Sequence, residues 1–363
     1  MAYKLSDIAR SIDAELLGDG DLEISGVAAP ENASPHDIAL AMDPKYAASI
    51  AEGAAVVGML WQGADWQSLG LKAAILPSRP RVSLSGLSAL LDQGQGFERG
   101  IHPSAVVDPS ARIADDVSIG PLSVIAADAV IGRGSVIGPQ VFVGKGSVIG
   151  EDCLLREGTK IGADVSIGDR FIAQQNVSIG GDGFSFVTPE KSAVEETRDS
   201  LGSDVNAQGQ AWARIHSLGG VVIGDDVELG SLTSVDRGTV RPTRIGNGVK
   251  ADSLVQIGHN VVIGDHTLLC AQAGVAGSTV IGNFVVLGGQ SGVADNVTVG
   301  DGVIAGGGSK ILSNVPAGRA VLGYPAVKMD AHVEIYKASR RLPRLLKDID
   351  ALKKSVFNGG KTE

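Results

Sequence analysis

A histidine and an aspartate stand seven residues apart in a glycine-rich part of this 363-residue chain, and together they could do acid–base chemistry. His259 directly follows the pair Ile257-Gly258, where the chain is expected to turn and a side chain can face outward. Histidine suits proton transfer near neutral pH because its usual pKa lies there. A carboxylate such as that of Asp252 can hold an imidazole in one tautomer and stabilise its protonated form. A surface histidine and a turn aspartate are the alternative interpretations.

The segments that would position these residues are built on a six-residue repeat. From Ile101 the chain divides into 29 hexads, interrupted between about residues 182 and 218, and 26 of them begin with Ile, Val or Leu. A period of six fits neither a helix nor an alternating strand. It fits a solenoid with three short faces per coil, in which the lead residue points inward and the glycine that often follows helps the chain turn. Three hexads per coil predict nearly ten coils and a prism about 45 Å long.

The composition agrees with a thin prism and excludes several other classes of protein. Glycine accounts for 50 residues and aromatic residues for only 4%, although 44% of the chain is hydrophobic. The net charge of −10 argues against a nucleic-acid-binding protein. The sequence has no apolar run that could span a membrane, no signal-peptide pattern and only two cysteines. We therefore expect a cytoplasmic protein with neither a disulfide framework nor a metal site.

Changes in composition divide the chain into three predicted parts. Residues 1–98 have the pattern of a small α/β domain, including one helix over residues 5–16. Residues 99–324 form the prism, with the excursion at about 182–218. Residues 325–363 form a C-terminal helical extension, in which Pro343 kinks or starts a helix. This extension has nine Lys or Arg residues against five Asp or Glu residues, unlike the acidic remainder.

Motifs that interrupt the repeat indicate a family. They are GDGF in the excursion, DRGT after it and QIGHNVVIG around His259, together with an N-terminal AMDPKY and the order of the domains. This combination resembles the UDP-3-O-acylglucosamine N-acyltransferases, which make an early intermediate of lipid A. The related UDP-N-acetylglucosamine O-acyltransferases lack a comparable N-terminal domain. The resemblance implies a left-handed parallel β-helix, although parallel crossovers in general favour the right hand.

The resemblance also implies roles for residues near the histidine. His259 would take the proton from the attacking amine, Asp252 would be its aspartate, and Gly277 would donate its N–H to the oxyanion. Gly277 lies 18 residues after His259, which is one predicted coil, and glycine permits close approach. Gln256 and Asn260 flank the histidine and are interpreted either as contacts to the sugar or pantetheine, or as ladder residues of the coil.

The N-terminal domain is expected to hold the uridine of the acceptor. The family uses a stacking aromatic residue and an Asn-Pro-Lys-Tyr segment, and this chain retains Lys45 and Tyr46. Asp43 replaces the asparagine, and Leu40 stands where the phenylalanine is expected. An aspartate can accept a hydrogen bond from uracil N3–H but has no amide donor. Asn296 aligns with a second histidine of the family, so no cationic contact is expected there.

The resemblance implies partners as well. The acyl donor would be acyl carrier protein, whose phosphopantetheine arrives with it, so no separate cofactor is expected. The C-terminal basic residues would form either a docking surface for this acidic partner or a solvated helix face. They are Arg340, Arg341, Arg344 and Lys347. The family further implies a homotrimer with active sites between neighbouring prisms.

The predicted function is the transfer of a 3-hydroxyacyl chain to the 2-amine of UDP-3-O-(3-hydroxyacyl)glucosamine. Two alternatives stay open. One is a nucleotide-sugar N-acetyltransferase that uses acetyl-CoA. The other is a non-catalytic β-helix scaffold in which His259 is incidental.

Overall fold

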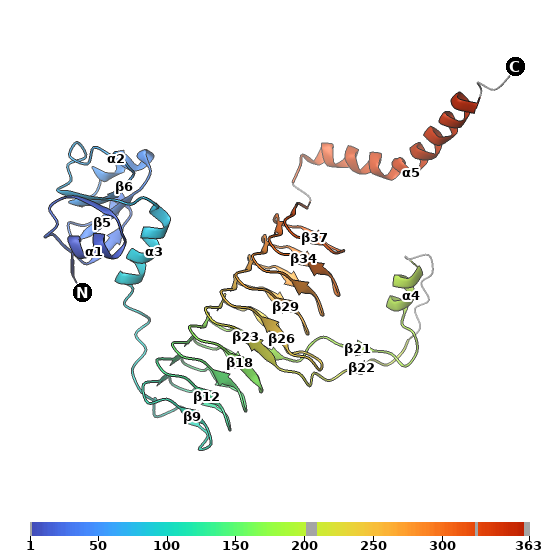
Figure 1. Ribbon diagram of the computed structural model, residues 1–363, viewed down its shortest axis with the longest axis horizontal. Coiled ribbons are helices and arrows are strands. Elements are labelled where there is room, and N and C mark those ends of the chain that lie inside the picture. Colours follow the sequence, from blue (N-terminus) through green and yellow to red (C-terminus); the bar gives the residue numbers. More distant parts are fainter. Residues whose placement is uncertain (1, 201–208, 324–325, 359–363) are drawn as a thin grey trace. The chain divides into compact units, whose positions relative to one another are not determined.

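The computed structural model describes residues 2–200, 209–323 and 326–358, and it divides into two compact units, Met1–Gly96 and Phe97–Glu363 (Figure 1). The division lies close to the boundary predicted between residues 98 and 99. Residues 201–208 of the predicted excursion and the first residue of the predicted C-terminal extension, at 325, lie outside the described residues.

The N-terminal unit is a small α/β domain built on a five-stranded sheet. The sheet has the order β2 (Glu15–Gly18), β7 (Ala73–Leu76), β6 (Val57–Leu60), β5 (Asp37–Ala41) and β4 (Gly26–Ala28). All four residues of β6 and of β7 are buried, as is typical of parallel strands covered on both faces. The remaining elements are β1 (Tyr3–Lys4), β3 (Glu23–Ile24), α1 (Leu5–Ser11), η1 (Pro30–Asn32), η2 (Pro44–Tyr46), α2 (Ala47–Ile50) and α3 (Pro80–Leu91).

The first helix is shorter than its sequence pattern predicts. Helix α1 ends at Ser11, and the last two residues of the predicted helix, 15–16, lie in strand β2. The apolar side chains Leu5 and Ile8 are buried by the helix, whereas Leu16 packs from the sheet. Because all of these side chains contribute to one core, helix and strand give the same apolar pattern over this short stretch.

The second unit contains the predicted prism, a left-handed parallel β-helix. Its three faces are parallel sheets of ten, ten and nine strands, most of them two residues long. In the regular coils residues 18 apart are register partners, as are Val124 and Phe142, which is the predicted coil length. Across the slip in the repeat the partners are 22 apart, as are Ser234 and Gln256. The face that carries His259 consists of β8 (Val106–Val107), β11 (Val124–Ile125), β14 (Phe142–Val143), β17 (Lys160–Ile161), β20 (Ser178–Gly181), β25 (Ser234–Asp236), β28 (Gln256–Ile257), β31 (Gly274–Val275), β34 (Gly292–Val293) and β37 (Lys310–Ile311).

The other two faces follow the same ladder. One runs from β10 (Ser118–Ile119) to β38 (Ala320–Val321) and includes β24 (Glu228–Leu229), β27 (Lys250–Ala251) and β30 (Leu268–Leu269). The other runs from β9 (Arg112–Ile113) to β35 (Thr298–Val299) and includes β18 (Val165–Ile167), β23 (Val221–Ile223) and β26 (Thr243–Ile245). Each strand thus pairs only with the coils before and after it, so stability is built up coil by coil.

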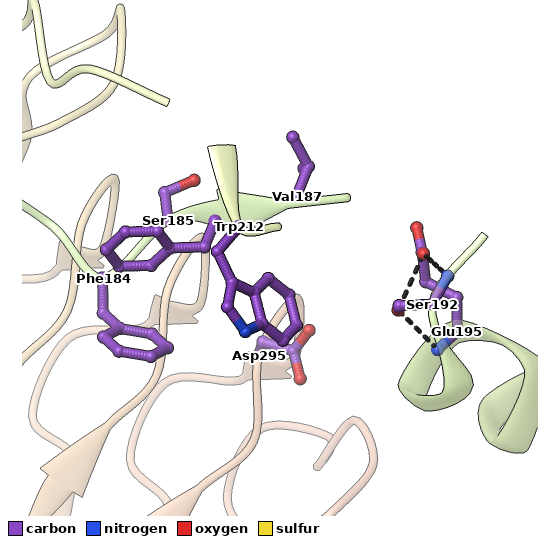
Figure 2. Close-up of a pocket in the computed structure, with 8 residues that line it drawn as sticks. Phe184, Ser185, Val187, Ser192, Glu195, Trp212 and Asp295 are labelled. Carbon is purple, nitrogen blue, oxygen red and sulfur yellow. Dashed lines mark hydrogen bonds between the residues drawn. The ribbon is translucent and has the colours of Figure 1, made fainter. Parts of the chain in front are cut away.

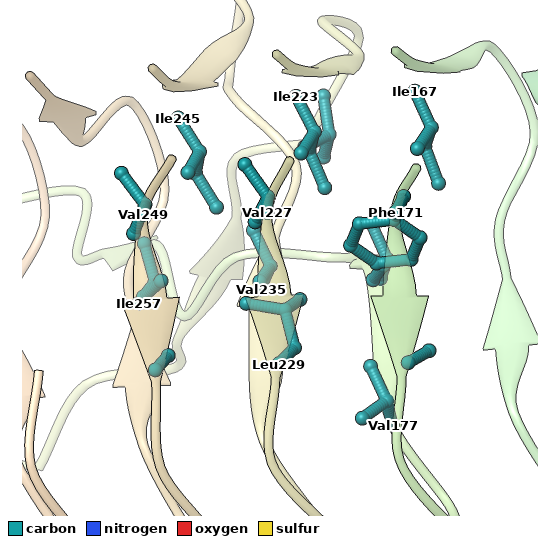
Figure 3. Close-up of a cluster of buried hydrophobic side chains, with 14 of the residues drawn as sticks. Ile167, Phe171, Val177, Ile223, Val227, Leu229, Val235, Ile245, Val249 and Ile257 are labelled. Atoms are coloured by element: carbon teal, nitrogen blue, oxygen red, sulfur yellow. The ribbon is translucent and has the colours of Figure 1, made fainter. Parts of the chain in front are cut away.

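The lead residues of the hexads form a continuous aliphatic core along the prism (Figure 3). Ile223, Ile245 and Ile257 are almost completely buried in it. Phe171 adds a ring to a core otherwise made of Ile, Val, Leu, Ala and Cys. A core this thin has room for stacked aliphatic side chains and little room for rings, which explains the low aromatic content.

The glycine that follows a lead residue serves close packing more than turning. A Cβ on Gly258 would lie only 2.9 Å from the Gly277 nitrogen of the next coil. The left-handed backbone conformation occurs two residues after this glycine. Non-glycine residues often adopt it: φ is 60° at Asn260 and 57° at Gln140. Asparagine is among the residues that accept this conformation most readily. The prediction that these glycines help the chain turn therefore needs this correction.

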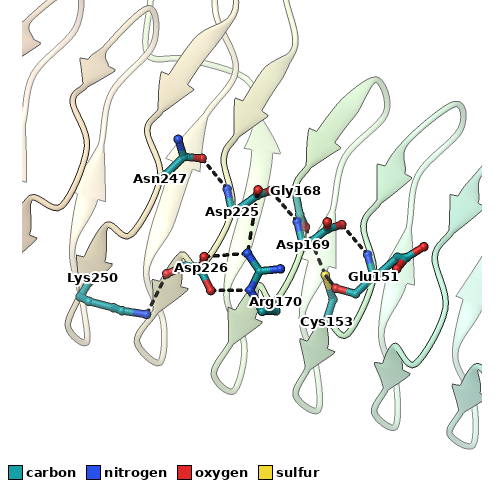
Figure 4. Close-up of polar contacts among 9 residues, drawn as sticks. All are labelled: Glu151, Cys153, Gly168, Asp169, Arg170, Asp225, Asp226, Asn247 and Lys250. Atoms are coloured by element: carbon teal, nitrogen blue, oxygen red, sulfur yellow. Dashed lines mark hydrogen bonds and ion pairs between the residues drawn. The ribbon is translucent and has the colours of Figure 1, made fainter.

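Polar ladders connect the coils at the corners (Figure 4). Asp169 Oδ1 accepts a hydrogen bond from the Glu151 N–H at 2.8 Å, and Asp225 Oδ1 accepts one from the Asp169 N–H at 2.9 Å. Beside this column Arg170 donates from Nε to Asp226 Oδ1 at 2.6 Å, and this bond lowers the pKa of Asp226. The ladders hold successive corners in fixed register, which makes the prism a rigid support.

The excursion leaves the prism after β20 and returns at β23. It contains β21 (Phe186–Val187), α4 (Ala193–Ser200) and β22 (Ala213–Arg214), with β21 and β22 paired antiparallel. Val165 and Val221 are register partners, so the coil closes normally across a separation of 56 residues instead of 18. The excursion is therefore an insertion that leaves the ladder intact.

The chain beyond the prism forms helix α5 (Met329–Asn358). Pro343 lies inside this helix, which excludes it as the start and agrees with a kink. Apolar residues recur along the helix and are exposed in the single chain: Val333, Ile335, Tyr336, Leu342, Leu345, Leu346, Ile349, Leu352 and Val356. Among the described residues no helix has the length and apolar character needed to cross a bilayer.

Candidate active site

The corner after strand β28 places His259 directly against the next coil. Gln256 and Ile257 of β28 are the register partners of Gly274 and Val275 of β31, so the turn that follows brings His259 over Gly277. A Cβ on Gly277 would lie 2.6 Å from His259 Nε2, and only glycine fits there without displacing the ring. This is the neighbour that the 18-residue spacing predicts.

The Gly277 N–H is available for a ligand. In the parts of the chain that the structure describes, this N–H donates to no protein acceptor, although the N–H of the next residue, Ser278, donates to the His259 carbonyl at 2.9 Å. A backbone donor beside a histidine is the arrangement that stabilises an oxyanion during acyl transfer.

The opposite side of the imidazole is closed by the excursion. A Cβ on Gly183, in the GDGF motif, would lie 2.6 Å from His259 Cβ and 3.0 Å from Cδ2. The Gly183 N–H donates to Ser217 Oγ at 3.1 Å, which ties the two ends of the excursion together. The ring therefore lies between two glycines, Gly183 and Gly277, that are far apart in the sequence. The spacing of the repeat does not predict the first of them, although the motif that contains it marks where the repeat ends.

The third contact of the ring is made by Asn260. Its Oδ1 lies 3.0 Å from His259 Nδ1 and also accepts a hydrogen bond from the Thr239 N–H at 3.0 Å. Its Nδ2 donates to the Arg241 carbonyl at 2.8 Å. Asn260 therefore connects the histidine to Thr239 and Arg241 of the preceding coil, which agrees with its interpretation as a ladder residue and adds a contact to the imidazole.

His259 and Gly277 line a cavity of about 720 Å³ that is open to solvent. Asp236, at the end of β25, faces the same cavity, and its Oδ2 accepts a hydrogen bond from Gln256 Nε2 at 3.1 Å. Burial raises the pKa of Asp236, and the hydrogen bond from Gln256 and the charge of His259 oppose this rise. The spacing of the repeat does not single out this carboxylate, although it is the aspartate of the DRGT motif.

Asp252 lies in a different cavity. This cavity, of about 560 Å³, is on the face formed by β24, β27 and β30, and Lys250 and Cys270 also line it. Asp252 Oδ1 accepts a hydrogen bond from the Ser253 N–H at 2.7 Å. Among the described residues no hydrogen bond or ion pair joins Asp252 to His259. Seven residues advance the chain by about one face, so within one chain the two side chains lie at different corners of the coil.

An aromatic cavity of about 690 Å³ adjoins the cavity of His259 (Figure 2). Phe184, Phe186 and Asp295 line both cavities, so the two are neighbours. Trp212 and Phe184 are 62% and 85% exposed, which is unusual for such large apolar side chains. The Arg214 guanidinium lies 4.6 Å from the centre of the Phe186 ring. Several aromatic residues within the excursion of a chain that has so few are the sequence signal that could have identified this cavity.

Asn296 also lines the cavity of His259. Its Nδ2 lies 3.2 Å from Asp295 Oδ2 and donates a hydrogen bond to it. The charged member of this pair is the Asp295 carboxylate.

The residues predicted to bind uridine lie together in the N-terminal unit. Asp43 Oδ1 accepts a hydrogen bond from the Lys45 N–H at 3.0 Å and caps η2. The Lys45 ammonium lies 3.5 Å from Asp43 Oδ2 and 4.8 Å from the centre of the Tyr46 ring. The Asp43 charge raises the pKa of Lys45. Leu40 belongs to β5 and is half-buried, so Tyr46, 43% exposed, offers the accessible ring in this cluster.

The predicted docking residues all lie on the C-terminal helix. The four basic residues are all exposed on α5: Arg340, Arg341, Arg344 and Lys347. Cys153 and Cys270 are free thiols, and burial raises the pKa of Cys153. Within the described ranges of the chain, no cluster of three His, Cys, Asp or Glu side chains is arranged to hold a metal ion.

The prism and its histidine–glycine corner define the class of protein, a hexapeptide-repeat acyltransferase. The sequence profile of the bacterial transferase hexapeptide (six repeats) family matches residues 110–145 and 242–277. The chain is 61% identical to the UDP-3-O-acylglucosamine N-acyltransferase of Ruegeria pomeroyi over the full length of both proteins. It is 61% identical to that of Paracoccus denitrificans, over 98% of this chain and 97% of the relative. The chain belongs to the UDP-3-O-acylglucosamine N-acyltransferase family.

More distant comparisons agree with this membership. The Pseudomonas aeruginosa UDP-3-O-acylglucosamine N-acyltransferase is 41% identical over 77% of this chain and 73% of its own. Among solved structures, the Arabidopsis UDP-N-acetylglucosamine acyltransferase superposes with a TM-score of 0.50 at 22% identity, covering 72% of this chain and 85% of that one. The structural likeness supports the fold, and the identity to the sequence relatives shows the family membership.

Proposed function

We propose that this protein transfers a 3-hydroxyacyl chain from acyl carrier protein to the 2-amine of UDP-3-O-(3-hydroxyacyl)glucosamine in lipid A biosynthesis. The observation that carries the proposal is the close approach of His259 Nε2 to Gly277, whose N–H donates to no acceptor among the described residues. The acceptor is inferred from the names of the close relatives. Gly183 and Gly277 lie against the two sides of the imidazole, which explains why the base is fixed in position.

The reaction follows from these positions. His259 Nε2 removes a proton as the acceptor amine attacks the thioester carbonyl and the C–N bond forms. The carbonyl oxygen becomes an oxyanion beside Gly277, whose N–H donates a hydrogen bond to it. When the C–S bond breaks, the imidazolium returns the proton to the leaving thiolate, so the products are an amide and the thiol of the carrier.

Asp236 and Gln256 would orient the acceptor. Their hydrogen bond holds a carboxylate at the same cavity wall as His259. A carboxylate in that place can pair with the ammonium form of the acceptor and hold the nitrogen within reach of the base. Asn296 supplies a neutral polar group at the same cavity.

The aromatic cavity of Phe184, Phe186 and Trp212 would take the 3-O-acyl chain of the acceptor, since it is apolar and adjoins the cavity of His259. Tyr46 and Lys45 would bind the uridine diphosphate by stacking and charge, and Asp43 would accept from uracil N3–H.

The donor would dock on the basic side chains of α5. Arg340, Arg341, Arg344 and Lys347 are exposed and belong to a locally basic helix on an acidic protein, which suits an acidic carrier. Phosphopantetheine would arrive on that carrier, so the reaction needs no further cofactor. We also place the protein in the cytoplasm, consistent with its two free cysteines.

We further propose a homotrimer in which Asp252 lies at the active site of a neighbouring copy. Its separation from His259 within one chain and its place in a polar cavity on another face support this arrangement. The test is to purify mixed trimers of tagged His259→Ala and Asp252→Ala chains. If each variant alone is inactive, recovery of activity in the mixture supports sharing between copies. No recovery contradicts it.

The experiment that tests the function is a transfer assay with UDP-3-O-acylglucosamine and a series of 3-hydroxyacyl carrier proteins of increasing chain length. The proposal expects amide formation with one favoured chain length and no turnover with acetyl-CoA. Saturable turnover with acetyl-CoA alone would establish the N-acetyltransferase alternative. If acceptor binds but no donor is turned over, the chain is a scaffold.

A further inference from the structure

The contacts of His259 Nδ1 determine which ring nitrogen carries the proton. Asn260 Oδ1 accepts from the Thr239 N–H, which is only a donor, and Asn260 Nδ2 donates to the Arg241 carbonyl, which is only an acceptor. These two backbone groups fix the orientation of the amide. The atom that faces His259 Nδ1 at 3.0 Å is therefore the oxygen.

An amide oxygen beside Nδ1 requires that Nδ1 carries a hydrogen. In the neutral ring the lone pair then belongs to Nε2, which is the atom that faces Gly277. The opposite tautomer would set a lone pair of Nδ1 against the Asn260 oxygen and leave Nε2 unable to accept a proton. Asn260 thus does for this histidine what the aspartate does in a Ser-His-Asp triad, with a neutral oxygen in place of a carboxylate.

The position of Asn260 is itself fixed by the fold. Its backbone has φ of 60°, and its N–H donates to Thr243 Oγ1 at 2.9 Å. The Thr243 hydroxyl in turn donates to the Asp236 carbonyl at 2.7 Å. The side chain therefore spans from the corner of β28 to the segment between β25 and β26, where the six-residue repeat slips.

The geometry points to Asn260 as the positioning residue that sets the tautomer of the catalytic base, in the place where the sequence suggested Asp252. This inference rests on the proposed role of His259 as that base. Asn260 acts through His259 rather than on the substrate, so its loss should lower kcat and leave acceptor binding largely intact.

The test compares the pH dependence of kcat/KM for Asn260→Ala, Asn260→Asp and the wild type. We expect Asn260→Ala to lower kcat about 100-fold with little change in the acceptor KM. We expect Asn260→Asp to retain more activity and to shift the acidic limb of its profile to higher pH, because a carboxylate stabilises the protonated ring. The other charged groups that line the cavity are unchanged in both variants: Asp182, Arg214, Asp236 and Asp295.

A matched control separates positioning from general loosening of the turn. Thr243→Val removes the acceptor of the Asn260 N–H but keeps the Asn260 side chain, so we expect lower thermal stability with the acidic limb unmoved. An Asn260→Ala enzyme with near wild-type kcat would overturn the inference. If Asn260→Ala does not fold, an Asn260→Asp profile with its acidic limb at the wild-type position would do the same. Full activity of His259→Ala would instead overturn the proposed base.

Discussion

At the corner that carries His259, three segments distant in the sequence meet, whereas the corner that carries Asp252 is formed by stacked coils alone. The first has Gly183 from the excursion, Asp236 from before the slip in the repeat and Gly277 from the next coil. The second is lined by side chains of neighbouring strands of one face. The prism alone thus supplies a polar cavity lined by its own coils, and the interruptions of the repeat add side chains and backbone from other segments to one of its corners.

The largest effect that tests this difference is the loss of the base. We expect His259→Ala to fold normally and to lose about 10³-fold in kcat, because the three atoms nearest a Cβ on Gly277 all belong to this imidazole. The measurement is steady-state transfer with circular dichroism as a check of folding. His266→Ala is the matched control, since His266 is also a corner residue but stacks on Phe284 at 5.5 Å. An equal loss of kcat in both variants would mean that the effect is not specific to the corner of His259.

The next largest effect is expected from filling the space beside the ring. Gly277→Ala would place a Cβ 2.6 Å from His259 Nε2, which displaces the imidazole and shields the N–H donor. We expect kcat to fall about 100-fold, as for loss of an oxyanion donor. Gly274→Ala, three residues earlier, places its Cβ in open space and should stay close to wild type. Comparable activity of the two variants would remove Gly277 from the site.

A smaller effect tests the contribution of the excursion. Trp212→Ala removes an exposed ring from the aromatic cavity, and we expect the KM for the acylated acceptor to rise about tenfold with a smaller change in kcat. The rise should shrink as the acyl chain of the acceptor is shortened, since fewer methylene groups are then buried. A KM change that is independent of chain length would place the chain elsewhere.

The basic helix should contribute a few-fold effect. Reversing Arg340, Arg341 and Arg344 to Glu is expected to raise the KM for the carrier-bound donor at low salt and to leave kcat nearly unchanged. The measurement is the donor KM at low and high ionic strength. A KM that is the same as that of the wild type at low salt would exclude docking at these residues.

The smallest effect concerns Asp236, the carboxylate that is hydrogen-bonded to Gln256 beside His259. Burial raises the pKa of Asp236 in the folded state, so its contribution to stability is complete below the unfolded pKa and is lost as the pH rises through the folded pKa. Asp236→Asn has no carboxylate to ionise and avoids this loss. As the pH rises from the unfolded to the folded pKa of Asp236, the free energy of unfolding of the variant should increase relative to that of the wild type by less than about 1 kcal/mol. Urea titrations at pH 4 to 7 measure it. A constant difference across this range would contradict the effect of burial.

Much of the fold follows from the repeat, because its period is set by local backbone geometry. Hexads led by Ile, Val or Leu predict inward side chains, three faces and an 18-residue coil, and the ladder of register partners agrees. The same period predicts that Gly277 neighbours His259. The helix expected over residues 5–16 is wrong in its second half, because helix α1 and strand β2 bury apolar residues in one core and short patterns do not separate them.

The rest of the site depends on contacts that no period describes. Gly183 and Trp212 reach the site through an insertion whose length is unrelated to the coil, and Asp236 does so where the register slips. Spacing in the sequence also suggests Asp252 as the partner of His259. In a three-sided coil, however, seven residues span about one face, so the two side chains lie at different corners.

The sequence by itself determined the prism, its core and the pairing of His259 with the glycine one coil away, since repeating backbone hydrogen bonds fix all three. Only the tertiary structure decided which groups surround the imidazole. It placed Asn260 on Nδ1, Gly183 against the ring and the aromatic cavity beside them, because those positions result from packing between segments that do not share the repeat.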